Sequence, residues 1–460
     1  MIAAESLILT LRKRHHTPAA QLLSELGVSR PTLMRAVRAA GTSVLSIGRA
    51  RRTSYAARRP LRGSDAPLPV FRVDPRGGSE QAGQIDLAYP NGCVLEYRGG
   101  TFEWPLDADM RDGWFEGIPY PMQDLRPDGF LGRAFARENA AVLQVGEDPR
   151  TWSDDDALYA LSLLGADLGG NFIIGEAAYR LWLEQLQRPL DIVTDVQLEQ
   201  SYPARAQRAM QQGVGGSSAG GEFPKFTAVR ELGGTPAHVI VKFSGSDESP
   251  GTERWSDLLV CEQLAASCVF HLPGLVASSS SIHRAGGRTF LEVVRFDRHG
   301  AHGRSPLCSW AAVNNDWFGL SGRPWTEGAA HLRERGLIDA ETRDAVARLW
   351  HFGQLIANTD MHDGNLSFLP GAPGLRPAPV YDMLPMLYAP QRGVELPERN
   401  FAPRLPLPAE RESWQQAAQA AMDFWSRASN DNRISDGFRP TCARNAQAVR
   451  DAASLSATMA

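Results

Sequence analysis

The ten residues from Asn358 to Ser367, which read NTDMHDGNLS, constrain this chain more than any other stretch. Asp360 and Asn365 stand in the spacing D-x-x-x-x-N after an apolar run over residues 349–356, and another acid, Asp382, follows in the sequence PVYD. Sites of phosphoryl transfer use this spacing to place a catalytic base and a metal-binding amide on one loop. Such a loop also needs groups that hold a nucleotide, and the preceding sequence supplies candidates for them.

A glycine-rich segment followed by a lysine on a strand is the first of these candidates. Residues 213–221 hold five glycines and two serines, so their backbone N–H groups can approach phosphates closely, although a flexible linker has a similar composition. The apolar segment HVIVKF over 238–243 predicts a strand that contains Lys242. A lysine on a strand behind a glycine-rich loop is the kinase arrangement for holding the α- and β-phosphates of ATP.

The rarity of lysine in this chain favours a specific role for Lys242. Only three of the 48 basic residues are lysines, namely Lys13, Lys225 and Lys242. An ammonium group meets phosphate oxygens as a compact point charge, which the planar guanidinium of arginine does not. The alternative is a strand-end lysine whose ammonium simply reaches water.

The segments after this strand agree with a two-lobed, kinase-like layout of the α+β class. The helix expected after Lys242 carries Glu262, the candidate partner of its ammonium, and Asp257, the rival candidate. Residues 289–296 predict a strand that leads to a hinge, where backbone groups meet adenine. After Trp310 the pattern becomes mostly helical, with helices expected over 342–356, 409–428 and 437–455.

The first 62 residues form a basic head on an otherwise acidic chain. They hold 12 arginines and lysines and two acids, a net charge of +10, whereas the whole chain carries −4. Helices expected over 4–13, 19–26 and 30–40, with Gly27 in the turn between the last two, form a helix-turn-helix pattern. Strands over 43–47 and 53–57 would form a wing. Positive charge on these elements indicates DNA as the partner of the head.

Six residues of the head are candidates for DNA contact. They are Arg30, Thr32 and Arg35 in the major groove and Arg49, Arg51 and Arg52 at phosphates. The alternative is a small helical domain with a solvated basic face. Because winged helices commonly bind DNA as dimers, a homodimer is the prior expectation.

The composition divides the chain into four expected domains. They are a winged helix-turn-helix domain over 1–62, a small β subdomain over 70–150, a kinase N-lobe over 151–300 and a helical C-lobe over 301–460. Residues 60–69, rich in Pro, Gly and Ser, would link the first two. There is no apolar stretch of 18 residues, no signal peptide and no C-x-x-C among the five cysteines, so we expect a cytoplasmic protein without a membrane span.

Together these motifs resemble those of the HipA family, bacterial serine/threonine kinases of type II toxin–antitoxin modules. The matching pieces run in order over about residues 70–440: SSAGG at 217–221 with PK at 224–225, VKF at 241–243, RFDR at 295–298, the 358–367 stretch, and YD at 381–382. The basic head resembles a subgroup with a helix-turn-helix fused in front of the kinase. Eukaryotic-type kinases differ, because this chain has no HRD before the loop and no DFG at the metal site.

The resemblance implies a role for each matching position. Asp360 would accept the proton of a substrate hydroxyl, Asn365 and Asp382 would bind Mg²⁺, and Lys242 would orient the ATP phosphates. Ser218 matches the family's autophosphorylation serine, whose phosphate would add about two negative charges and expel the loop from the nucleotide site. The other positions matched to the ATP site are Ala219, Gly220, Gly221, Lys225, Glu262, Val294, Arg295, Phe296, His362 and Tyr381. The family's type of substrate is an aminoacyl-tRNA synthetase, and a separate antitoxin is a further candidate partner.

Two other functions and one structural alternative stay open on the sequence alone. A small-molecule phosphotransferase shares the D-x-x-x-x-N spacing and the later Asp, although the RFDR signature at 295–298 argues against it. A DNA-binding regulator could use a kinase fold only to sense nucleotide. The structural alternative for Asp360, Asn365 and Asp382 is a capped loop with solvated carboxylates. We also expect the head to repress the chain's own promoter.

Overall fold

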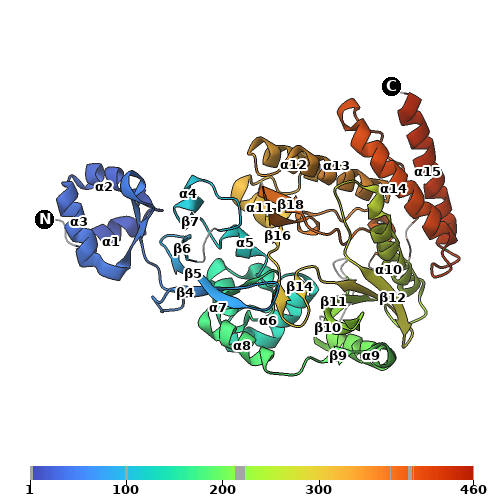
Figure 1. Ribbon diagram of the computed structural model, residues 1–460, viewed down its shortest axis with the longest axis horizontal. Coiled ribbons are helices and arrows are strands. Elements are labelled where there is room, and N and C mark those ends of the chain that lie inside the picture. The colour runs from blue at the N-terminus through green and yellow to red at the C-terminus, as the bar shows by residue number, and fades with distance from the viewer. Residues whose placement is uncertain are drawn as a thin grey trace.

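The computed structural model describes residues 4–98, 102–212, 223–372, 374–391, 396 and 398–458. The glycine-rich positions Ser217, Ser218, Ala219, Gly220 and Gly221 lie outside the described residues. Figure 1 shows an elongated molecule, with the N-terminal head at one end and the C-terminal helices at the other. Within the described part, no helix is both long enough and apolar enough to cross a membrane. All five cysteines are buried and unpaired.

The head consists of three helices and a small sheet. The helices are α1 (Ala4–Arg12), α2 (Ala19–Leu26) and α3 (Arg30–Ala40), and the strands β1 (Thr17–Pro18), β2 (Val44–Ile47) and β3 (Ser54–Ala57) pair in the order β1-β3-β2. The bounds of the three helices and of β2 and β3 agree within one residue with the ranges predicted from the sequence, whereas the strand β1 was not predicted. Gly27 ends α2 with φ of +59°, a left-handed conformation that glycine adopts without steric cost.

A second sheet forms next to the head. Its strands β4 (Leu68–Val73), β5 (Ser79–Leu87), β6 (Cys93–Tyr97), β7 (Trp114–Phe115) and β8 (Phe172–Ile174) pair in the order β7-β6-β5-β4-β8. The accompanying helices are α4 (Ala108–Arg111), α5 (Tyr120–Gln123), α6 (Gly129–Leu143), α7 (Asp154–Leu164) and α8 (Glu176–Leu186). Strand β8 thus belongs to this sheet although it follows residue 150, where the small β subdomain was predicted to end.

The segment expected as a linker over 60–69 is tied to this second part. Leu61 is buried, Arg62 forms an ion pair with Asp156 at 2.5 Å, and Arg59 forms one with Asp155. A flexible linker would leave its side chains in water, so the head is docked through packed contacts.

A five-stranded sheet carries the candidate nucleotide lysine. Its strands are β9 (Ile192–Val193), β10 (Lys225–Leu232), β11 (Thr235–Phe243), β12 (Ser280–Ala285) and β13 (Arg288–Val294), in the order β12-β13-β11-β10-β9. Side chains alternate between the two faces of each strand. Val239 and Val241 pack on one face with α9 (Asp195–Gln212), whereas the other face, which bears Leu291, packs on α10 (Pro250–Cys268).

The last part of the chain is mostly helical. It contains α11 (Trp310–Trp317), α12 (Trp325–Glu334), α13 (Ala340–Leu355), α14 (Arg411–Asn430) and α15 (Arg439–Thr458). Short strands β14 (Arg298–His299) and β15 (Gly303–Arg304) form a hairpin, and β16 (Cys308–Ser309), β17 (Ser367–Gly371) and β18 (Gly374–Pro377) form a three-stranded sheet. Helix α13 buries Val346, Leu349 and Phe352 and ends directly before the candidate catalytic loop.

Candidate active site

Lys242 lies in the interior of the molecule with a carboxylate on each side. Its ammonium donates hydrogen bonds to both oxygens of Glu262 on α10, at 2.7 and 2.9 Å, and it also forms an ion pair with Asp382. Lys242 keeps 7% of its surface exposed and Glu262 keeps 5%. A buried ion pair is retained only when its partners are well hydrogen-bonded, so this geometry fixes the ammonium in place.

The alternative partner, Asp257, is engaged elsewhere. Its carboxylate accepts hydrogen bonds from the backbone N–H and the hydroxyl of Ser435, both at 2.7 Å, and lies 3.5 Å from Arg254. Burial raises the pKa of Asp257, while these hydrogen bonds oppose that effect. Glu262 is therefore the acid that pairs with Lys242.

The loop after α13 presents Asp360 to solvent and holds Asn365 in the interior. The side-chain amide nitrogen of Asn365 donates to the backbone carbonyl of Asp360 at 2.8 Å. Because this bond uses the amide nitrogen, the amide oxygen is the candidate ligand atom of Asn365. Asp360 is exposed, which is where a base that receives a proton from a protein hydroxyl must lie.

Asn358 connects the two acids of the site, a role that the sequence did not suggest. Its Oδ1 accepts the backbone N–H of Asp360 at 3.0 Å, and its Nδ2 donates to the backbone carbonyl of Asp382 at 3.3 Å. Asp382 has φ of +55°, a left-handed conformation that is uncommon for residues other than glycine. The sequence signal that could have indicated this role is the place of Asn358 two residues before Asp360, in the triplet NTD.

Asn314 on α11 is a second residue that sequence reasoning missed. Its Nδ2 donates to Asp363 Oδ2 at 3.0 Å, within the catalytic loop, and its Oδ1 accepts the backbone N–H of Leu320 at 2.9 Å. Nothing in the local sequence separates Asn314 from its neighbour Asn315, because only the packing of α11 selects the inward side chain.

Tyr381, His362 and Phe296 surround this loop. The Tyr381 hydroxyl donates to the backbone carbonyl of Gly364 at 2.8 Å, and its ring stacks on Phe296 with centroids 6.1 Å apart. His362 is exposed, and its Nδ1 accepts the backbone N–H of Gly364 at 3.1 Å. The structure thus places these three residues together beside Asp382. Lys225 lies directly opposite Lys242 across β10 and β11.

Arg295, at the expected hinge, forms several interactions within the protein. Its guanidinium binds Asp297 at 2.9 and 3.0 Å and the carbonyl of Leu168 at 3.3 Å, and its backbone N–H donates to His238. The backbone N–H of Val294 likewise donates to the carbonyl of Ser279. The guanidinium of Arg295 thus belongs to an ion cluster within the protein, and a contact of this segment with the nucleotide stays a prediction.

The donor set beside Lys242 fits a magnesium ion bound together with phosphate. Among the described residues, no three His, Cys, Asp or Glu side chains cluster as a metal site. Mg²⁺ at a phosphotransfer site needs fewer protein ligands, because it keeps waters and binds phosphate oxygens. Glu262, Asp360 and Asp382 outnumber Lys242 by two negative charges, which suits a divalent cation.

The head presents most of its candidate DNA contacts to solvent. Arg30 and Arg35 on α3 are exposed, as are Arg49 and Arg51 in the turn between β2 and β3, and Thr32 is half-buried. Arg52 differs, because it forms an ion pair at 3.0 Å with Asp112, which lies just after α4 in the second part of the chain. Arg52 nevertheless stays exposed, so its contact with a DNA phosphate remains a prediction.

Comparisons with known proteins agree with this geometry. Residues 64–183 match the family model of the YjjJ-like toxin, middle domain, and residues 217–452, just over half of the chain, match the HipA-like C-terminal domain. Toxin YjjJ from Escherichia coli (strain K12) is 37% identical over 422 residues, which cover 92% of each chain. A chain from the Shewanella oneidensis MR-1 complex of HipA, HipB and operator DNA matches with a TM-score of 0.50 at 13% identity, over 83% of this chain and 96% of that one. The last likeness concerns the fold alone.

Proposed function

We propose that this chain, which belongs to the family of HipA-like toxins, is an ATP- and Mg²⁺-dependent serine/threonine protein kinase. The observation that carries the proposal is the buried Lys242 held between Glu262 and Asp382, beside the loop of Asp360 and Asn365. A lysine–glutamate pair on a strand and a helix, together with an Asp and an Asn at the metal site, is the set that kinases use for phosphoryl transfer.

The residues divide the chemistry between them. Lys242, oriented by Glu262, would bind the α- and β-phosphates of ATP, and Asn365 and Asp382 would hold the metal. Bound Mg²⁺ supplies positive charge that offsets the charge of the phosphate oxygens. Asp360 would take the proton from a serine or threonine hydroxyl as its oxygen bonds to the γ-phosphorus and the bond to the ADP oxygen breaks.

Family membership supports a proposal for the substrate class and for the regulation. We propose that the protein substrate is a component of translation, such as an aminoacyl-tRNA synthetase. Ser218, in the segment between α9 and β10, is the proposed autophosphorylation site. Its phosphate would repel the ATP phosphates and remove the loop from the nucleotide site.

DNA binding by residues 1–62 is a second proposed function, which a different observation favours. The exposed arginines of α3 and of the turn after β2 lie on the two elements by which a winged helix contacts DNA. The HipA structure above was solved with HipB and operator DNA, so a separate antitoxin and an operator are the partners to test here. Autorepression through the head, as a homodimer, is the form that we propose.

The test of the kinase proposal is autophosphorylation with labelled ATP and Mg²⁺ in wild type, Asp360→Ala and Ser218→Ala proteins. Label on wild type that is lost in both variants would support the kinase and its regulatory serine. Label lost only in Asp360→Ala would remove the Ser218 assignment. An unlabelled wild type whose intact mass shows no earlier phosphate would overturn the kinase proposal.

Two further observations separate the rival functions. A labelled protein in a lysate supports a protein kinase, whereas a labelled metabolite supports a small-molecule phosphotransferase. A nucleotide-sensing regulator would be favoured by two results together. The wild-type protein would label no protein, and the Asp360→Ala variant would still repress the promoter fully.

A further inference from the structure

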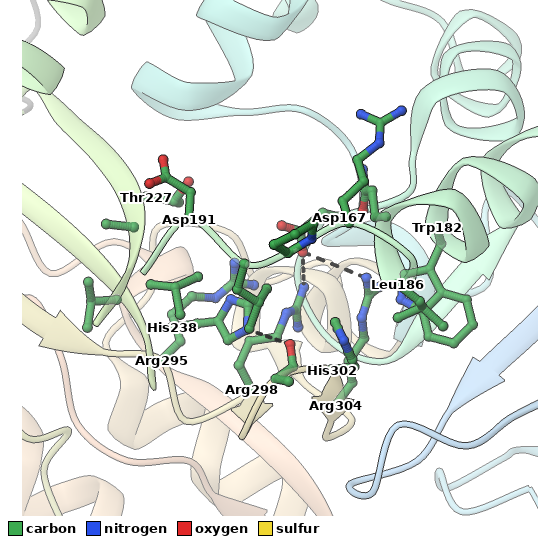
Figure 2. Close-up of a pocket in the computed structure, with 18 of the residues that line it drawn as sticks. Asp167, Trp182, Leu186, Asp191, Thr227, His238, Arg295, Arg298, His302 and Arg304 are labelled. Atoms are coloured by element: carbon green, nitrogen blue, oxygen red, sulfur yellow. Dashed lines mark hydrogen bonds and ion pairs between the residues drawn. The ribbon is translucent and has the colours of Figure 1, made fainter. Parts of the chain in front are cut away.

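A pocket of about 290 Å³ lies outside the proposed catalytic site. Its walls come from the end of α8 and the loop after it, from β10 and β11, and from the segment that runs from Arg295 to β15 (Figure 2). None of the residues that hold the proposed ATP and metal, Lys242, Glu262, Asp360, Asn365 and Asp382, is among its lining residues. The pocket is thus a separate place in the molecule.

One wall of the pocket is a cluster of charged side chains, in which Asp297, Arg298 and Arg304 are buried and Asp167 is partly exposed. Arg298 donates to Asp297 at 2.8 Å and to Asp167 at 2.9 Å, and Arg295 donates to Asp297 at 2.9 Å. Figure 2 shows the guanidinium groups of Arg298 and Arg304 directed toward Asp167. With three arginines against two aspartates, the cluster has one positive charge in surplus. Charges buried in a protein are normally paired, so this surplus requires an explanation.

Arg304 is the member of the cluster with unused hydrogen-bonding capacity. It keeps 4% of its surface exposed, and its Nη2 donates to the carbonyl of Ala166 at 2.7 Å. Asp167 is 3.7 Å away, and Nη1 of Arg304 has no hydrogen-bond partner among the described residues. Burial, and then the neighbouring Arg298, lowers the pKa of Arg304 to about 10. Both effects disfavour its charge, and the attraction of a bound anion would oppose them.

The remaining walls combine further positive charge with apolar surface. Arg205 pairs with Asp191 at 2.5 Å, and Arg188 is largely exposed at the loop after α8. Trp182, Leu186 and Val229 supply apolar contacts. Five arginines thus line the pocket together with Asp167 and Asp191. Asp297 pairs with two of these arginines and Glu184 lies 3.9 Å from Arg188, which leaves one positive charge in surplus.

We propose that this pocket binds a small organic oxyanion, through its phosphate or carboxylate group, with the apolar body of the ligand against Trp182, Leu186 and Val229. Guanidinium groups bind phosphate and carboxylate by paired, charge-assisted hydrogen bonds. The volume suits a small metabolite and is too small for a polypeptide segment. Arg295 precedes Phe296, which stacks on Tyr381 beside Asp382, so the pocket adjoins the junction between the lobes.

Replacing Asp167 should change the affinity for an anion in a direction that tests the proposal. Its carboxylate lines the pocket and is the internal counter-ion of Arg298 and Arg304. An incoming anion competes with this carboxylate for the same cations. Removing the charge of Asp167 should therefore strengthen anion binding, whereas removing the charge of Arg205 should weaken it.

The test is isothermal titration calorimetry of the full chain, at low ionic strength, with inorganic phosphate and with citrate as probes. We expect at least one probe to bind, and which of the two binds identifies the oxyanion. Arg205→Gln should weaken this binding about tenfold, the size of one charge-assisted hydrogen bond, and Asp167→Asn should strengthen it. Arg180→Gln is the matched control, because Arg180 is a helix arginine paired with Glu176 outside the pocket.

A Lys242→Met variant distinguishes the pocket from the proposed ATP site. Probe binding that persists in this variant and follows the Arg205 and Asp167 changes would support the proposal. Binding lost in Lys242→Met would place the anion in the nucleotide cleft and overturn it. Absence of binding for both probes, equal loss in Arg180→Gln, or binding that Asp167→Asn leaves unchanged or weakens would also overturn it.

Discussion

The side-chain amide of Asn358 donates a hydrogen bond from Nδ2 to the backbone carbonyl of Asp382, at 3.3 Å. The same side chain accepts the backbone N–H of Asp360 at 3.0 Å. One buried residue therefore joins the segment of the proposed base to the segment of the proposed metal ligand. Since phosphoryl transfer depends on the mutual position of these groups, Asn358 should matter for activity although it need not touch the substrate.

Replacing Asn358 by alanine should lower kcat more than it raises KM for ATP. Outer partners that orient catalytic or metal ligands typically contribute about 10- to 100-fold, and we expect a loss of kcat in that range. Steady-state kinetics at several Mg²⁺ concentrations would measure it. Asn445→Ala is the matched control, because Asn445 is a buried asparagine that bonds Tyr388 instead. Equal losses in both variants would contradict the assigned role.

Changing Glu262 to glutamine should reduce kcat/KM by at least about tenfold, because the Lys242 ammonium loses its charged partner in a buried site. Asp257→Asn is the comparison on the same helix. It should change the free energy of unfolding little, because asparagine keeps an oxygen that accepts from Ser435 and removes a buried charge, and it should leave the activity of the folded protein nearly unchanged. A Glu262→Gln protein that keeps the wild-type kcat/KM would contradict the functional role of the pair between Lys242 and Glu262.

The ion pair between Arg52 and Asp112 predicts that the second part of the chain restrains DNA binding by the head. Asp112→Ala should free Arg52 for a phosphate and tighten binding to upstream DNA. Arg51→Ala should weaken binding and reduce the slope of log K against log salt by about 1. Mobility shifts over a salt series would measure both changes.

The control for Asp112 is Asp109→Ala, which removes a charge from the adjacent helix α4 and leaves the ion pair between Arg52 and Asp112 in place. Equal tightening by both variants would indicate a general effect of net charge. Failure of the full chain to bind any upstream DNA at low salt would remove the head's proposed function.

Asp316 should make stability depend on pH. Burial raises the pKa of Asp316 to about 6, above the ordinary value of 3.8, although hydrogen bonds from Gln123 and Asn315 oppose the shift. The folded state therefore binds a proton more tightly than the unfolded state, so this group's contribution to stability is full below about pH 4 and falls as the pH rises toward 6.

We expect Asp316→Asn to stabilise the protein by about 1–2 kcal/mol at pH 7.5 relative to its effect at pH 4. Denaturant unfolding of both proteins at pH 4, 5, 6 and 7.5 would measure the difference. A constant difference at all four pH values would show that the carboxyl does not titrate in this range.

The expectation of a HipA-family chain with an α+β kinase-like fold is confirmed by the family matches and the structural likeness. This expectation could be formed from the sequence because D-x-x-x-x-N, the strand lysine and the RFDR run are local patterns. Each is read from neighbouring residues, and their order along the chain is visible in the sequence. The helices over 4–12, 19–26 and 30–40 were likewise predictable, since apolar periodicity and capping residues are read directly from sequence.

The sequence by itself determined the elements and the types of chemical group, while the tertiary structure decided which groups meet. Glu262 and Asp257 are five positions apart on one helix, about 140° around its axis, and only packing selects the one that faces Lys242. The partner of Asp257, Ser435, lies 178 residues away. The contacts of Arg52 with Asp112 and of Arg295 with the carbonyl of Leu168 join distant parts of the chain for the same reason. Periodicity sets the face of an element, but contacts between distant segments depend on how whole elements pack.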